Sequence, residues 1–125
     1  MGDPYHCHCQ KTGRLIQQKL GWNKNKFYVS FQSRFGPEPW LKPYTDEIII
    51  ELAKKGIKKI TIVSPGFVTD CLETLDELKN EANELFIENG GIKLNYVSCL
   101  NDSNDAINFF KKLIVTNLLG WGNFK

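Results

Sequence analysis

A run of acids along one predicted helix is the feature of this sequence best suited to chemistry. The segment from residue 70 to residue 88 contains seven acids against one base, so its charge is −6, and the rest of this +2 chain carries +8. At 100° per residue, six of the acids fall within one sector of the helix, narrower than a third of its circumference. These six are Asp70, Glu73, Glu77, Glu81, Glu84 and Glu88.

A solvated helix face normally alternates acids with bases. Like charges at i and i+4 instead cost about 0.2–0.5 kcal/mol per pair, and both Glu73–Glu77 and Glu77–Glu81 incur that cost. Carboxylate oxygens are the ligands that hard divalent cations prefer. We therefore interpret Glu73 and Glu77 as metal-handling residues, and we assign Glu84 and Glu88 to an ordinary solvated surface.

The elements around this helix place its first turn at a crevice. A strand over residues 57–63 ends at Ser64-Pro65-Gly66, and the helix runs from about Thr69 to Glu88. Ligands of open α/β sheets bind beyond the carboxyl ends of the strands. Glu73 should face that crevice, while the opposite side of the helix should face the core. The core-facing residues would be Leu72, Leu75, Leu78, Ala82, Leu85 and Phe86.

The remaining pattern alternates strands with helices. Strands are expected at 27–31 and 92–97, and helices at 8–20, from 45 to about 55, and from a cap at Asp102 or Ser103 to about Leu118. Such alternation implies parallel strands and right-handed crossovers. The chain is therefore expected to form a single domain, a doubly wound parallel α/β sheet.

A second candidate surface follows the strand at 27–31. Ser33, Arg34 and Trp40 offer a hydroxyl, a cation and an aromatic ring close together in sequence, a combination that suits an anionic planar ligand. The ring would lie against the ligand plane, and the two polar residues would bind its carboxylates. Taken alone, the segment is more typical of a proline-rich connection plugged by Trp40.

Two histidines and two cysteines alternate at residues 6–9. A closed zinc site needs ligands from two separated pieces of chain, and Cys71 and Cys99 are suitable only if the fold brings them close. We favour a turn entering a helix, and leave open a small metal- or redox-responsive domain that uses Cys7 and Cys9.

Composition excludes several classes of protein. A net charge of +2 does not indicate nucleic-acid binding. No apolar run approaches the roughly 18 residues of a membrane span, and the first residues lack the pattern of a secretory signal. The expectation is a cytoplasmic protein whose contact with membranes is at most peripheral.

Three stretches resemble the C-terminal half of bacterial ferrochelatases. The first is Gly2-Asp3-Pro4-Tyr5 with Cys7 to Thr12, and the second is Gln32-Ser33-Arg34-Phe35-Gly36-Pro37 continuing through Trp40 to Glu47. The third, Pro65-Gly66-Phe67-Val68-Thr69-Asp70-Cys71-Leu72-Glu73, resembles the signature around the catalytic glutamate. Leu100-Asn101-Asp102 fits a later loop of the family. The likeness extends over essentially the whole chain.

The resemblance implies insertion of ferrous iron into a porphyrin, protoporphyrin IX or coproporphyrin, to make haem, with Fe²⁺ as substrate and no cofactor required. Glu73 matches the catalytic glutamate, and Glu77 and Glu81 match acids of the family's metal path. Asp70, which begins the same stripe, joins them as a candidate metal ligand. The matching porphyrin-binding positions are Ser33, Arg34, Trp40 and Phe67.

The family has two similar α/β halves, and nothing here matches the active-site histidine of the N-terminal half. We therefore expect this chain to be inactive alone, and to need that missing half as a partner. The alternative is a non-catalytic porphyrin- or metal-binding module.

Overall fold

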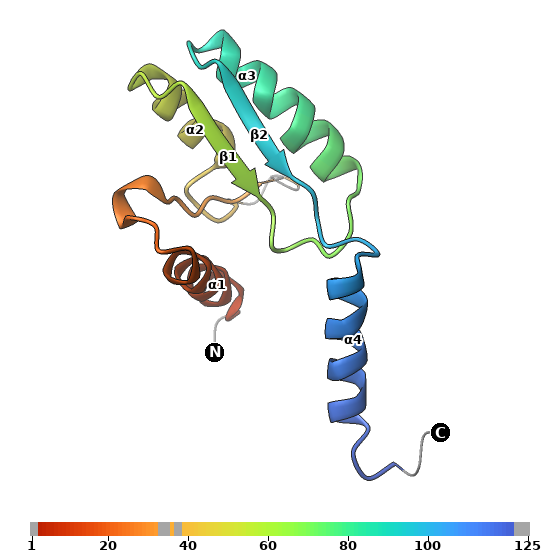
Figure 1. Cartoon of the computed structure of the whole chain (residues 1–125). Coiled ribbons are helices and arrows are strands. Elements are labelled where there is room, and N and C mark those ends of the chain that lie inside the picture. Colours follow the sequence, from red (N-terminus) through yellow and green to blue (C-terminus); the bar gives the residue numbers. More distant parts are fainter. Residues whose placement is uncertain (1–2, 33–35, 37–38, 122–125) are drawn as a thin grey trace.

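The computed structural model describes residues 3–32, 36 and 39–121. Its elements run in the order α1 (Tyr5–Leu20), η1 (Lys24–Lys26), α2 (Thr45–Lys54), β1 (Lys59–Val63), η2 (Glu73–Glu81), α3 (Ala82–Glu88), β2 (Lys93–Val97) and α4 (Asn104–Asn117). Helices and parallel strands alternate from α2 onwards (Figure 1). The predicted α/β class is confirmed.

The core lies between the sheet and the helices α2 and α3. Strands β1 and β2 pair in parallel with Lys59 opposite Lys93 and Val63 opposite Val97. Ile49 from α2 and Phe86 from α3 are buried together with Leu94 from β2. A Cβ at Gly91 would lie 2.4 Å from the Phe86 ring, so only glycine lets the chain turn tightly over this ring into β2.

The predicted strand at 27–31 is wrong. Among the described residues, its only sheet-like pairing is an isolated bridge from Phe31 to Tyr44. The backbone amide of Phe31 donates to the Pro43 carbonyl at 2.9 Å, and its carbonyl accepts from the Thr45 amide at 3.2 Å. Aromatic and β-branched residues favour an extended backbone, but a strand also needs a neighbour along its length. The sheet of the described chain accordingly has two strands rather than three.

The long helix predicted over 69–88 has two parts. From Glu73 to Glu81 it is a π-helix, η2, which continues directly as α3. Its hydrogen bonds join residues five apart, so each turn is wider than the α-helical turn assumed from the sequence. The buried side chains therefore recur every four residues, at Thr74, Leu78, Ala82 and Phe86.

Two predicted core residues at the start of this helix lie at the surface instead. Leu72 is 73% exposed and Leu75 is 42% exposed, while Thr74 is fully buried. The Thr74 hydroxyl accepts a hydrogen bond from the Cys71 amide at 2.9 Å and donates to Asp70. Burial of this polar side chain is tolerated because neighbouring residues satisfy the hydrogen bonds of its hydroxyl.

The terminal helices flank this unit differently. Helix α1 ends at Gly21, whose φ of +66° is left-handed as expected of a helix-ending glycine. Helix α4 is capped by the Ser103 hydroxyl, which accepts from the Ala106 amide. It extends away from the sheet and the other helices (Figure 1). In the described part of the chain, no helix is long and apolar enough to cross a bilayer.

Candidate functional site

An acidic groove of about 670 Å³ lies between the first turn of α2 and the helices η2 and α3. No lysine or arginine is found among its described lining residues. Helix α2 contributes its first turn, and η2 with α3 contributes the acid stripe, so carboxylates face the groove from both sides. The six acids that line it are Asp46, Glu47, Glu77, Glu81, Glu84 and Glu88.

The groove is also lined by two acids that the sequence assigns to a solvated surface. Glu84 and Glu88 are exposed, as expected of a solvated surface, yet they line the same groove as Glu77 and Glu81. Four acids of the predicted stripe thus border one hollow. Sequence patterns alone do not predict that Asp46 and Glu47 face these acids, because this depends on how α2 packs against α3.

Gln32 connects this groove to the next segment of chain. Its side-chain amide donates to a carboxylate oxygen of Glu77 at 2.8 Å. Its backbone carbonyl accepts from the indole nitrogen of Trp40 at 3.1 Å. The two bonds hold the Trp40 ring and the Glu77 carboxylate in a fixed relation to one backbone position. Gln32 begins the second of the sequence motifs described above. Its bond to Glu77 joins residues 45 positions apart, so the motif alone does not reveal it.

An apolar cavity of about 490 Å³ lies next to the groove. Trp40 and Phe67, both candidates from the sequence, line it together, although they follow different elements. Gln32, Phe31 and Thr45 border the cavity and the groove alike. The apolar cavity and the row of carboxylates therefore lie on two sides of the residues that border both, among them Gln32.

Glu73 stands at the start of η2 and does not line either hollow. Its side chain is exposed. The Cys71 thiol and the residue's own backbone amide hold the pKa of its carboxyl below the usual range. Hydrogen bonds to a carboxylate favour its charged form, so Glu73 carries a full negative charge at neutral pH.

Asp70 is the centre of a hydrogen-bond network. Its carboxylate accepts from the Asn101 amide at 2.7 Å and the Tyr96 hydroxyl at 2.6 Å. The Thr74 hydroxyl and the Cys99 backbone amide donate to it as well, at 3.1 and 3.3 Å. The bonds from Asn101 and Tyr96, in that order, hold the pKa of Asp70 well below its usual range.

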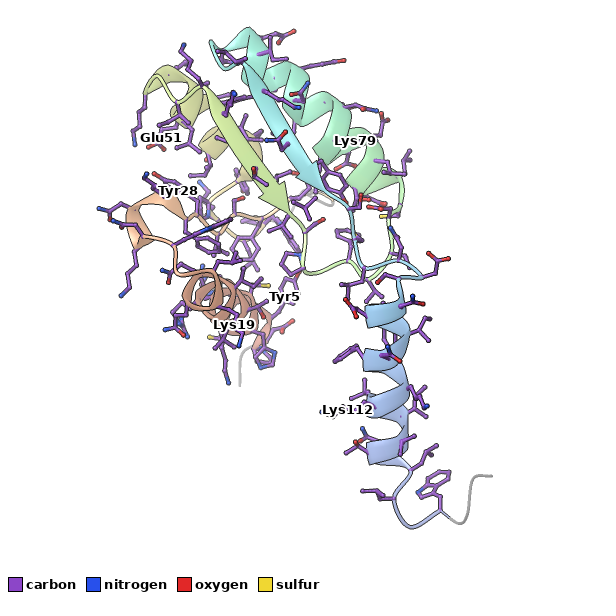
Figure 2. All side chains as sticks on the ribbon, in the orientation of Figure 1. Tyr5, Lys19, Tyr28, Glu51, Lys79 and Lys112 are labelled. Atoms are coloured by element: carbon purple, nitrogen blue, oxygen red, sulfur yellow. The ribbon has the colours of Figure 1, made fainter. Side chains whose placement is uncertain are left out.

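This network ties the loop after β2 to the start of η2. Because the Asp70 oxygens are engaged by four protein donors, its geometry favours a structural role over the metal ligation expected from the sequence. Burial and the bond to Asp70 raise the pKa of Tyr96 to about 12, so Tyr96 remains a hydrogen-bond donor. The side chains of the described residues are drawn in Figure 2.

Two other sequence candidates gain no support. Ser33 and Arg34 lie outside the described residues. All four cysteines are free thiols, and no group of three or more His, Cys, Asp or Glu in the described chain is arranged to hold a metal ion. The ring of His6 stacks on Phe31, with centroids 5.4 Å apart. The alternating histidines and cysteines thus form the first turns of α1.

Comparison with known proteins identifies the family. The Ferrochelatase family model matches residues 1–118, nearly the whole chain. The chain belongs to the ferrochelatase family.

Proteins similar to this chain include several bacterial ferrochelatases. The ferrochelatase of Allorhizobium ampelinum (strain S4) is 54% identical over 120 residues, and that of Agrobacterium fabrum (strain C58) is 53% identical. Each match covers 96% of this chain and 35% of the relative. The chain thus spans about a third of the length of the curated relatives it matches, less than the half expected from the sequence.

Proposed function

We propose that this chain forms the iron-handling part of a ferrochelatase, an enzyme that inserts Fe²⁺ into protoporphyrin IX and releases two pyrrole protons to form haem. The observation that carries the proposal is the acidic groove beside the apolar cavity, with Gln32 bordering both. Fe²⁺ is a substrate here, and no cofactor is required. The cytoplasmic location expected from the sequence stays a prediction.

The groove provides the route for iron. Its carboxylates supply the oxygen ligands that divalent metals prefer. Glu81 and Glu77 take the ion along the π-helix towards Glu73, the first residue of η2. Because the pKa of Glu73 is lowered, its carboxylate is better suited to accept metal than to retain a proton.

The apolar cavity provides the surface for the porphyrin. Trp40 and Phe67 are 38% and 36% exposed, so each ring is partly buried and still offers a face to a planar ligand. Ser33 and Arg34 are proposed to bind the porphyrin carboxylates. Coproporphyrin, which carries more carboxylates, is the alternative substrate.

The proposal is tested in a chimera in which this chain replaces the matched 120-residue stretch of the Allorhizobium ampelinum ferrochelatase. Glu77→Gln keeps the size of the side chain and removes one groove charge. We expect the KM for Fe²⁺ in haem formation to rise at least about tenfold, the scale on which metal affinity responds to a lost partner.

Asp76→Asn is the matched control, because it removes one charge from the same helix at a position outside the groove. Its KM for Fe²⁺ should stay unchanged. Equal effects of the two substitutions would show that only the overall charge matters, and would refute the proposed route.

One observation favours a second candidate, a non-catalytic binding module. The chain covers only 35% of its relatives, and catalysis needs groups held jointly in position. The isolated chain should then quench porphyrin fluorescence on binding without forming haem when Fe²⁺ is added. Haem formation by the isolated chain would exclude this candidate.

A further inference from the structure

Helix α4 presents an apolar half that the described chain does not cover. At 100° per residue, its apolar side chains other than Val115 span about half of the circumference, and Lys111, Asn108 and Lys112 lie on the other half. Several of these apolar residues are about half exposed or more: Ile107, Phe109, Leu113 and Ile114. Only Ala106, at the start of the helix, is buried.

Such a helix needs a partner for its stability. An isolated helix of 14 residues is marginal in water, because nucleation is costly and most helical stability in proteins comes from packing an apolar face. Ala106 lies in the same sector as Phe110 and Leu113. The one buried side chain of α4 therefore lies on the same side of the helix as the uncovered apolar residues.

The comparisons indicate which kind of partner covers it. The family match extends to residue 118, so α4 is an element of the family rather than an appendage of this chain. Each relative has about two-thirds of its length outside the match, since the match covers only 35% of it. An apolar face on a family element is most simply buried by the part of the family fold that lies outside this stretch.

The charges on α4 argue against a membrane surface. Helices that lie on membranes are typically rich in lysine and arginine on the polar face. Helix α4 contains Lys111 and Lys112 against Asp105, a net charge of only +1.

We propose that the apolar face of α4 is the surface on which the remaining two-thirds of a ferrochelatase packs. The inference rests on family membership and does not require the proposed iron route to be right. Ile114 and Val115 provide a matched pair for the test, because they are neighbours with the same exposure of 55%. Ile114 lies on the apolar half, and Val115 lies on the half that carries the lysines.

The experiment compares thiol labelling in the isolated chain and in the chimera with the Allorhizobium ampelinum enzyme. Ile114→Cys and Val115→Cys are each treated with a maleimide, and peptide mass spectrometry separates the new thiol from the four native ones. In the isolated chain both variants should react at similar rates. In the chimera we expect labelling of Ile114→Cys to slow at least about tenfold, while Val115→Cys should keep its rate.

Equal labelling of Ile114→Cys in the chimera and in the isolated chain would overturn the proposal. Protection in the isolated chain that grows with protein concentration would overturn it in favour of a second copy. Protection that needs vesicles of phosphatidylcholine and phosphatidylglycerol would overturn it in favour of a membrane.

If the chimera does not fold, amide hydrogen exchange in the unaltered Allorhizobium ampelinum enzyme decides the question. Slow exchange in the helix matching residues 104–117 supports burial, and exchange at the rate of a free helix refutes it. Neither readout uses iron or porphyrin, so a chimera that makes no haem can still confirm the docking surface.

Discussion

Replacing Tyr96 by phenylalanine tests the network that fixes the start of the π-helix. The substitution removes one hydroxyl, which donates to Asp70 at 2.6 Å, and keeps the ring. A hydrogen bond to a charged group contributes about 1.5–3 kcal/mol to stability. Asp70 keeps three other donors and Tyr96 is only partly buried, so we expect an effect at the lower end of this range. The free energy of unfolding should fall by about 1.5 kcal/mol at pH 7.

The pH dependence separates this bond from simple packing. The folded-state pKa of Asp70 is depressed, so the stability it contributes is present above its unfolded value of about 4 and is lost as the pH falls towards the folded pKa. The difference between the natural chain and Tyr96→Phe should therefore persist from pH 7 to pH 5. It should shrink only well below pH 4, as the pH falls towards the depressed folded-state pKa of Asp70 and the carboxylate becomes protonated in the folded proteins.

Urea unfolding followed by circular dichroism measures both quantities in the isolated chain. Tyr28→Phe is the control, because Tyr28 is 47% exposed and lies outside the Asp70 network. A loss for Tyr96→Phe no larger than that for Tyr28→Phe would refute the role of this bond. A loss that is independent of pH would assign the effect to ring packing instead.

Two further predictions concern the chimeric enzyme. Glu73→Gln should lower kcat about 10²–10⁴-fold with little change in porphyrin affinity. Steady-state haem formation measures both quantities, and a kcat equal to that of Asp76→Asn would contradict a catalytic role for Glu73. Trp40→Ala should weaken porphyrin binding at least about tenfold in a fluorescence titration, because it removes one wall of the apolar cavity. Trp121→Ala, at a residue 78% exposed and outside the cavity, should leave that affinity unchanged.

The sequence predicted the α/β class and most element boundaries because these depend on local chemistry. Gly21 ends α1 and Ser103 caps α4, as their residue types favour. The acid stripe was also visible, since it needs only a helical period. These features follow from a few neighbouring residues.

The pairing of strands and the width of the helical turns depended on contacts with the rest of the chain. The segment 27–31 has the composition of a strand, yet its only pairing among the described residues is the bridge from Phe31 to Tyr44. The helix that starts with the π-helical turns of η2 leaves Leu72 and Leu75 exposed and Thr74 buried. A period of 3.6 residues, applied to the sequence, cannot reveal that the turns are wider.

The site likewise divides between sequence and tertiary structure. Residue types and motifs singled out Glu77, Trp40 and Phe67, because each lies in a segment whose chemistry is apparent on its own. Only the packing of α2 against α3 brought Asp46 and Glu47 to face the acid stripe across one groove. Contacts between residues distant in sequence arise when the core closes, and that closure decided which of the many acids share a site.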